Sequence, residues 1–154
     1  MYYNLYGNSI QISIYDNAGQ ETFRHINESN LRSADACILV YDITNRKSFE
    51  ECNNDFKNRI KENCKKNIKV MVIGNKIDLE EYRIVSMEEG KDFALRNGYL
   101  FYEISCKNND NVFEAFEYLI SETKKEKEKE LENYEDFKNI TLNKKNNLKK
   151  KKCC

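Results

Sequence analysis

One short polar segment of this chain carries the residue types that can read a purine ring. Asn75, Lys76 and Asp78 follow directly after the apolar run 70–73 and Gly74. A carboxylate can accept two parallel hydrogen bonds from a ring N–H and an exocyclic amine, a pattern that guanine offers and adenine does not. A lysine stem can lie along a base and its ribose. By itself such a segment is more often an ordinary polar turn, so other features must decide between the two interpretations.

Two further polar segments also follow predicted strands. Residues 16–21 (Asp-Asn-Ala-Gly-Gln-Glu) come after the stretch 10–14, and residues 105–107 (Ser-Cys-Lys) come after the stretch 100–104. Open α/β sheets bind ligands in the crevice beyond the carboxyl ends of their strands. The placement of the three segments therefore predicts ligand contacts at the edge of a sheet.

The strands that position these segments are of two kinds. Residues 10–14 alternate apolar and polar side chains, as a half-exposed antiparallel strand does, and a Gly-Asn pair supplies a turn back to residues 2–5. Residues 37–41 and 70–73 are continuous apolar runs, which are typical of strands covered on both faces.

Helical signals alternate with these strands. An apolar stripe at helical spacing is formed by Phe49, Cys52, Phe56 and Ile60. The sequence Ser-Met-Glu-Glu at 86–89 is a capping box that opens a helix, and Asn-Gly at 97–98 closes it. Apolar residues within 112–120 mark a last helix. The alternation of strands and helices predicts an α/β protein with a parallel, doubly wound sheet.

Taken together, these segments resemble a Rab-family small GTPase of the Ras superfamily. The resemblance extends from about Leu5 to about Glu122, in order and with family-like spacing. Besides the three polar segments it includes Phe23-Arg24, Ala34-Asp35-Ala36, Leu39-Val40-Tyr41-Asp42-Ile43-Thr44 and Phe113-Glu114-Ala115-Phe116. The fold implied is that of a P-loop NTPase, namely the doubly wound sheet of a small G domain.

The phosphate-binding loop of that family, G-x-x-x-x-G-K-[ST], has no counterpart in this chain. None of the five glycines is followed by Lys-Ser or Lys-Thr. The segment that would carry the first switch and its metal-binding Thr is missing too, and by resemblance Met1 falls inside the second strand of the domain. The expected G domain therefore lacks its first strand, first helix and switch I. A gap or a non-native closure is expected between the strands at 10–15 and 37–42.

The resemblance assigns catalytic and metal-binding roles to the first polar segment. Asp16 would contact Mg²⁺ through water, the Gly19 N–H would meet the γ-phosphate, and Gln20 would orient the attacking water as the catalytic residue. Asn17 stands where Thr is usual. The only histidine, His25, is interpreted as a solvated loop residue rather than a general base.

The other two segments would hold the base. Asp78 would read the guanine, Lys76 would cover its ring, and Asn75 would tie the base loop to the phosphate loop. The Cys106 N–H would lie near the guanine carbonyl. The residues expected at GTP or GDP are Asp16, Asn17, Ala18, Gly19, Gln20, Asn75, Lys76, Asp78, Ser105, Cys106 and Lys107. Mg²⁺ and a guanine nucleotide are the implied cofactors, with weak or no binding in this chain.

Partner contacts are expected to depart from the family pattern. Tyr15 stands where Trp is usual, and Asn30-Leu31 occupies the place of a Tyr-Tyr pair in the second switch. The implied partners are Rab effectors and regulators: an exchange factor, an activating protein, and escort or dissociation factors. No nucleic-acid partner is expected. The aromatic residues lie mostly at positions of the predicted strands and helices that face the core, so they are interpreted as packing residues rather than as a surface on which bases stack.

The chain divides into a partial G domain at 1–123, a charged and largely disordered tail at 124–152, and a prenylation site at Cys153 and Cys154. Residues 124–154 carry 11 Lys against 6 acidic residues. By resemblance the terminal cysteines carry lipids, which together with the Lys run would attach the protein to a membrane. The expected location is the cytoplasmic face of an intracellular membrane, in exchange with the cytosol. No apolar run approaches the roughly 18 residues of a membrane span, and the other cysteines are expected to be free thiols.

Three hypotheses about function remain open. The chain can be a Rab-like switch in vesicle trafficking that hydrolyses GTP only together with a missing amino-terminal segment. It can instead be a truncated pseudo-GTPase, a membrane-tethered protein-binding module without hydrolysis. The third hypothesis is an unfolded product with no biochemical role. An upstream coding segment with G-x-x-x-x-G-K-[ST] would favour the first.

Overall fold

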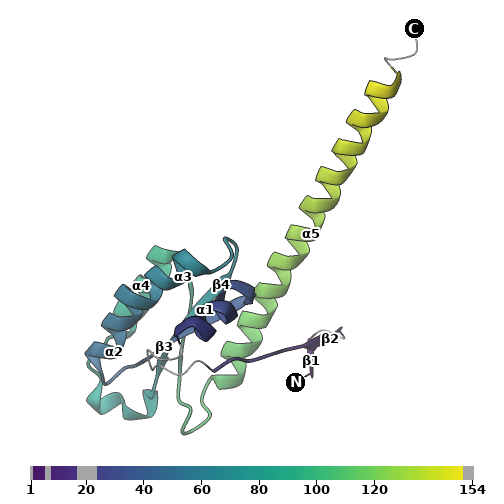
Figure 1. Cartoon of the computed structure of the whole chain (residues 1–154). Coiled ribbons are helices and arrows are strands. Elements are labelled where there is room, and N and C mark those ends of the chain that lie inside the picture. Colours follow the sequence, from purple (N-terminus) through teal and green to yellow (C-terminus); the bar gives the residue numbers. More distant parts are fainter. Residues whose placement is uncertain (1, 6–7, 17–23, 151–154) are drawn as a thin grey trace.

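A three-stranded parallel sheet forms the centre of the molecule (Figure 1). The computed structural model describes residues 2–5, 8–16 and 24–150. The sheet contains β3 (Ala36–Asp42), β4 (Lys69–Asn75) and β5 (Leu100–Ile104) in the order β3-β4-β5. These strands match the predicted runs, and their parallel pairing confirms the predicted α/β class.

Helices connect and cover these strands. They are α1 (Arg24–Ser33), α2 (Arg46–Glu51), the π-helical turn η2 (Cys52–Phe56), α3 (Lys57–Asn63), the 3-10 helix η3 (Ile77–Tyr82), α4 (Met87–Asn97) and α5 (Val112–Lys150). Because α2, η2 and α3 follow one another without a break, the predicted stripe lies on one continuous helical segment. Phe49, Cys52 and Ile60 are buried as predicted, whereas Phe56 is 38% exposed.

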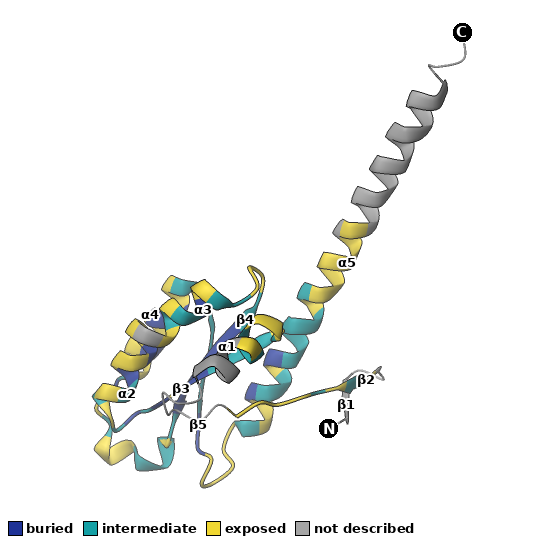
Figure 2. Ribbon diagram, in the orientation of Figure 1, coloured by how far each residue is buried: buried dark blue, intermediate teal, exposed yellow. Residues whose placement is uncertain are grey.

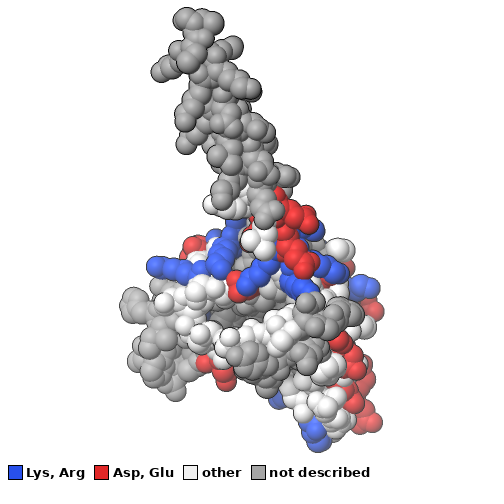
Figure 3. Space-filling model, turned by 90° about the vertical axis from the view of Figure 1, so that its right-hand side faces the viewer, with Lys and Arg blue, Asp and Glu red and all other residues white. Residues whose placement is uncertain are grey.

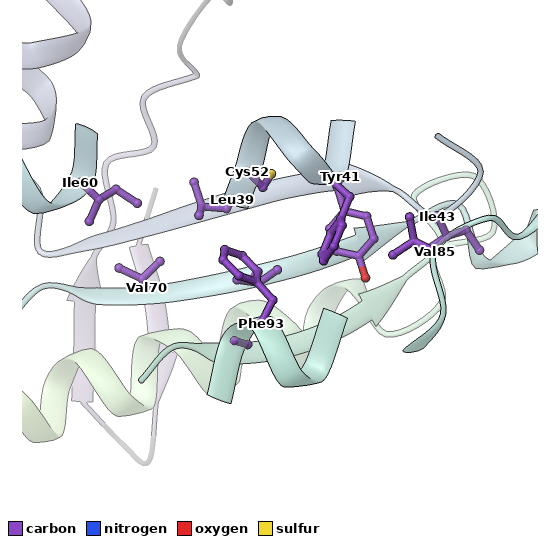
Figure 4. Close-up of a cluster of buried hydrophobic side chains, with 11 residues drawn as sticks. Leu39, Tyr41, Ile43, Cys52, Ile60, Val70, Val85 and Phe93 are labelled. Carbon is purple, nitrogen blue, oxygen red and sulfur yellow. The ribbon is translucent and has the colours of Figure 1, made fainter. Parts of the chain in front are cut away.

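Successive residues of β4 face opposite sides of the sheet and supply two separate cores. Val70 and Val72 join a cluster with residues of β3, α2, α3 and α4, including Leu39 and Phe93 (Figure 4). Met71 and Ile73 pack instead with residues of β5 and α5. Figure 2 shows the buried residues concentrated on the sheet and on the inner sides of these helices. The predicted coverage of β4 on both faces is confirmed.

Close packing around Tyr41 holds α4 against the sheet. The ring of Tyr41 is 1% exposed, and a side chain at Gly74 would put its Cβ only 2.8 Å from the Tyr41 hydroxyl oxygen. A Cβ at Gly90 on α4 would lie 2.7 Å from Phe101. Burial raises the pKa of the Tyr41 hydroxyl, which therefore stays protonated. The two glycines permit an approach that any larger residue would prevent.

The start and end of α4 are as predicted. Ser86 accepts from the Glu89 N–H while the Glu89 side chain accepts from the Ser86 N–H, which completes the capping box. Gly98 ends the helix with a left-handed φ of 69°. Arg46 donates to Glu89 over 2.7 Å, and this hydrogen bond, together with the one from the Ser86 N–H, lowers the pKa of Glu89 to about 2. The same glutamate thus caps α4 and links it to α2.

The amino-terminal hairpin differs from prediction in its length. Strand β1 (Tyr2–Leu5) pairs antiparallel with β2 (Asn8–Gln11), but the strand predicted to reach residue 14 ends at Gln11. The hairpin forms a sheet of its own, away from β3 (Figure 1). The expected gap between these two parts is confirmed. Residues 12–16 continue outside any strand, and Ile14 and Tyr15 are each 64% exposed.

The outer face of β3 is less covered than its apolar sequence predicts. Val40 is 53% exposed, although it lies in a continuous apolar run. The cluster that contains the α5 residues Ala115 and Leu119 includes Ala36 and Ile38 of β3 at its border but not Val40. In the described part of the chain, no strand pairs with the outer edge of β3.

The carboxyl-terminal region also differs from prediction. The sequence predicts a charged tail from 124 whose first part, to Glu132, could prolong the last helix and whose remainder is largely disordered. In the structure, α5 continues as a helix to Lys150. Ion pairs at helical spacing, such as Lys125–Glu122 at 2.6 Å, support the helix, and the segment contains neither Gly nor Pro. The backbone therefore shows no break at the predicted domain boundary, and α5 projects well beyond the sheet (Figure 1).

The open β3 edge generates a prediction about association. We expect the chain to self-associate at micromolar concentration, because an exposed apolar edge strand is a template for further pairing. Val40→Lys should reduce the scattering mass while changing the free energy of unfolding by no more than about 0.5 kcal/mol, as is usual for exposed positions. Multi-angle light scattering and thermal unfolding measure both quantities.

Ile84→Lys is the matched control, since Ile84 is comparably exposed but lies outside the sheet. It should leave association unchanged. A monodisperse wild-type monomer with a cooperative thermal transition would contradict the prediction.

Candidate functional site

The carboxyl ends of β3, β4 and β5 meet at one edge of the sheet. In the register, Asn75 at the end of β4 lies opposite Asp42 on β3 and Ile104 on β5. The polar segments that follow β4 and β5 are therefore neighbours in space, as the sequence predicts for parallel strands. They form the candidate site.

Asn75 links these two segments. Its Oδ1 accepts from the Lys76 N–H over 2.7 Å and from the Cys106 N–H over 3.2 Å. The Cys106 N–H, expected near a guanine carbonyl, is engaged within the protein in this structure. Asn75, expected to reach a phosphate loop, instead joins the two loops that flank the pocket.

Asp78 is the most enclosed carboxylate of the site, with a side chain only 7% exposed. Its Oδ1 accepts from the Ser105 hydroxyl over 2.6 Å, and its Oδ2 lies 3.7 Å from Lys107 Nζ. The hydrogen bond from Ser105 is the main reason that the pKa of Asp78 lies below its ordinary value. Ser105 is buried and itself accepts from the Asn108 N–H over 3.1 Å, so its hydroxyl is fixed in orientation.

A pocket of about 320 Å³ opens beside these residues, within the size range of small-molecule sites. Its walls are formed by Asn75, Lys76, Asp78, Leu79, Cys106 and Lys107. Five of these six are residues that the sequence predicts at the base. The pocket thus combines a fixed carboxylate, the stem of a lysine and one further cation, which is a set suited to a flat ring with N–H donors.

Of the residues predicted to form the phosphate and metal half of the site, only Asp16 belongs to the described part of the chain. Asp16 is exposed and does not line the pocket, and Asn17, Ala18, Gly19 and Gln20 lie outside the described residues. Among the described residues, no group of three or more His, Cys, Asp or Glu side chains could hold a metal ion. One exposed carboxylate does not fit a Mg²⁺ site by itself, so no step is derived through this ion.

Sequence reasoning missed two residues that support the pocket. Arg83 donates to Glu80 on η3 over 2.8 Å and to Glu103 on β5 over 2.7 Å, and these hydrogen bonds raise the pKa of its guanidinium further. The clamp holds the helix that begins at Ile77 against the strand that leads to Ser105. Asp42 is the second, and it contacts Lys76. Its place at the end of a buried strand was the signal available in the sequence.

The cysteines agree in part with prediction. Cys37, Cys52, Cys64 and Cys106 are free thiols, and burial raises the pKa of Cys37 to about 12. Cys153 and Cys154 lie outside the described residues. None of the described helices combines the length and apolarity needed to cross a bilayer.

Comparison with known proteins gives consistent matches. The Ras family model matches residues 2–125. The Ras-related protein Rab-8A of Bos taurus is 43% identical over 126 residues, which cover 82% of this chain and 60% of that protein. The GTP-binding protein ypt2 of Schizosaccharomyces pombe is 40% identical over 151 residues, which cover 96% of this chain and 73% of that protein. The matched part of this chain thus spans only about 60% of the length of Rab-8A.

The Asp78–Ser105 hydrogen bond generates a prediction about titration. Ser105→Ala should raise the pKa of Asp78 toward its ordinary value, because the donor that stabilises the carboxylate is removed. A lowered carboxyl pKa stabilises the fold above the pKa of the unfolded chain and loses this contribution as the pH falls through the folded-state pKa. The variant should therefore lose less stability on acidification than the wild type.

NMR titration of the Asp78 carboxyl carbon and acid unfolding curves measure these effects. Ser121→Ala is the control, because Ser121 bonds only within α5, to Tyr118 O. An unchanged Asp78 titration in Ser105→Ala would show that the serine does not set its ionisation.

Proposed function

We propose a function for this chain from the premise that it belongs to the Ras family of small GTPases, as a Rab-type member. It carries the guanine-binding part of a GTP/GDP molecular switch that acts in intracellular vesicle trafficking. The observation that carries the proposal is the fixed Asp78 carboxylate, which Ser105 orients at the wall of a pocket. The relative ypt2 is described as a GTP-binding protein.

Recognition of the base follows from the chemistry of the pocket. Asp78 stays ionised at neutral pH and offers both oxygens as acceptors, which suits a ring N–H beside an exocyclic amine. Adenine presents an unprotonated ring nitrogen at the corresponding position, so it would face the carboxylate with a lone pair. Lys76 supplies aliphatic surface for the ring, and Lys107 supplies positive charge near Asp78.

Hydrolysis requires more than this pocket. A triphosphate is held by clustered N–H groups, a lysine and Mg²⁺, and the sequence contains no G-x-x-x-x-G-K-[ST] motif. We assign Gln20 to orienting water and Asp16 to the metal only in a protein that also carries a phosphate loop and first switch. Within the 154 residues, the expected behaviour is weak base binding without turnover.

A second candidate is a membrane-tethered protein-binding module without GTP hydrolysis. It is favoured by the internal engagement of Asn75 and the Cys106 N–H, which leaves fewer groups for a nucleotide. Effectors and regulators of the Rab type are the proposed partners in both cases. The proposed location is the cytoplasmic face of an intracellular membrane, in exchange with the cytosol.

The first test concerns nucleotide affinity. The few hydrogen bonds available from Asp78 and its neighbours contribute about 0.5–1.5 kcal/mol each, and association costs at least about 4 kcal/mol. We therefore expect GTP to bind the 154-residue chain with millimolar affinity or weaker, and no detectable phosphate release. Titration with a fluorescent GTP analogue and Mg²⁺, and a phosphate-release assay, measure both.

Two variants and an extension sharpen this test. Asp78→Asn should abolish the preference for GTP over ATP, whereas Asp92→Asn, on the exposed side of α4, should not. Joining an upstream segment that contains the phosphate loop and first switch should restore tight GTP and GDP binding, and Gln20→Leu should then slow hydrolysis. Saturable micromolar binding by the chain alone would contradict the expected contribution of the phosphate loop.

The second test concerns the membrane. If Cys153 and Cys154 carry lipids, changing both to Ser should move the protein from membranes to the cytosol in a fractionation experiment. Neutralising the lysines at 149–152 should only weaken attachment, by about 1 kcal/mol for each. The double variant Cys37→Ser/Cys64→Ser, at two free thiols that do not line the pocket, controls for the loss of two thiols. Unchanged membrane fractionation of the terminal Cys variant would exclude this anchor.

A further inference from the structure

The Lys76 side chain is held at both ends. Its backbone N–H donates to Asn75 Oδ1 over 2.7 Å, in a left-handed conformation with φ of 72°. At the other end, Nζ lies 2.6 Å from Asp42 Oδ2. The four-carbon stem between these two anchors lines the pocket. A side chain that is otherwise among the most mobile of all types is thus ordered before any ligand arrives.

Asp42 is fixed without the help of Lys76. Its Oδ1 accepts from the Thr44 N–H over 2.8 Å and from the Thr44 hydroxyl over 2.7 Å. Its own N–H donates to Ser48 Oγ over 3.0 Å. With Oδ1 occupied by Thr44, Oδ2 faces Lys76 as a prepared acceptor. Asp42 is not among the residues that line the pocket, so its direct contact to the pocket wall is the one with Lys76.

The ion pair with Asp42 also changes which part of the Lys76 side chain is available to a ligand. The hydrogen bond to Asp42 raises the pKa of Lys76, and the ammonium group stays paired with a carboxylate at neutral pH. Burial acts to raise the pKa of Asp42, but the hydrogen bonds from Lys76 and Thr44 outweigh it and hold that pKa below its ordinary value. A paired ammonium attracts phosphate less strongly than a free one. The methylene groups are then the part of Lys76 available to a ligand.

We propose that Asp42 is a positioning residue of the guanine site, which holds the Lys76 stem as a preformed apolar surface for the flat ring of the base. This inference rests on the proposed function, because the ring is that of the guanine nucleotide assigned there. Asp42 sets the position of Lys76, and Asp78 reads the edge of the ring. The two carboxylates thus have separate roles on neighbouring strand ends.

Guanosine is the appropriate probe, because it carries the ring without phosphates. We would titrate the full chain with guanosine and follow the methylene protons of Lys76 by NMR, where a stacked ring shifts the resonances. Asp42→Asn keeps an Oδ1 acceptor for Thr44 but removes the charge that holds Lys76. It should weaken guanosine binding about two- to fivefold, the range of an exposed ion pair, and reduce the Lys76 shift at saturation.

Control and rescue variants separate positioning from folding. Asp92→Asn removes the same charge from an exposed pair with Arg96 on α4, and should change neither quantity. Asp42→Glu keeps the carboxylate and should restore part of the Lys76 shift. Lys76→Met removes the pair from the other side and leaves the Asp42–Thr44 contacts intact. The double variant Asp42→Asn/Lys76→Met tests whether the two residues act together. If Asp42 acts through Lys76, this variant should bind guanosine no more weakly than Lys76→Met alone.

The outcomes are distinct. Equal guanosine affinity and equal Lys76 shifts in wild type and Asp42→Asn would overturn the positioning role while leaving the guanine site in place. Additive losses in the double variant would overturn it as well, since Asp42 would then act by another route. No binding of guanosine to the wild-type chain would instead remove the guanine site itself, and with it any role of Asp42 there.

Discussion

The burial of β4 between two parallel neighbours is the constraint on which the rest of the structure depends. Met71, Val72 and Ile73 are almost completely buried, and their alternation supplies both cores. Because the strand pairs on both sides, its last residue is fixed against β3 and β5 together. The polar segment that follows can leave the sheet only at this point, beside the ends of two other strands. The packing of the apolar residues of β4 thus determines where the polar residues that follow this strand lie.

The polar groups at that edge stabilise one another. Asp78 accepts a hydrogen bond from Ser105, and Asn75 accepts one from the Cys106 N–H. Lys76 forms an ion pair with Asp42. The free-energy cost of removing a polar group from water is smaller when the group forms a hydrogen bond or an ion pair. A pocket whose polar groups bind one another therefore keeps its geometry without a ligand. The arrangement favours a ring of defined shape and hydrogen-bonding pattern.

The periphery of the molecule depends on weaker contacts. Salt bridges of Lys127 with Asp35, just before β3, and of Glu126 with Lys69, at the start of β4, tie α5 to the domain. Figure 3 shows acidic and basic side chains gathered where the helix leaves the domain. Exposed pairs of this kind contribute about 0–1 kcal/mol each. Among the residues whose side chains are described, the stability of the fold therefore lies mainly in the two cores.

The sequence alone determined the parallel strands, the capped helix α4 and five of the six residues that line the pocket, because hydrophobic periodicity, capping chemistry and motif spacing are local properties. It also indicated a gap after residues 10–15, since the family resemblance implied a strand that the chain does not contain. Tertiary structure decided the rest. Only pairing shows that β2 stops at Gln11, and only packing shows that Val40 is left exposed. The position of Asp42 at the end of a strand is visible in the sequence, but its pairing with Lys76 depends on the register of two strands distant in sequence.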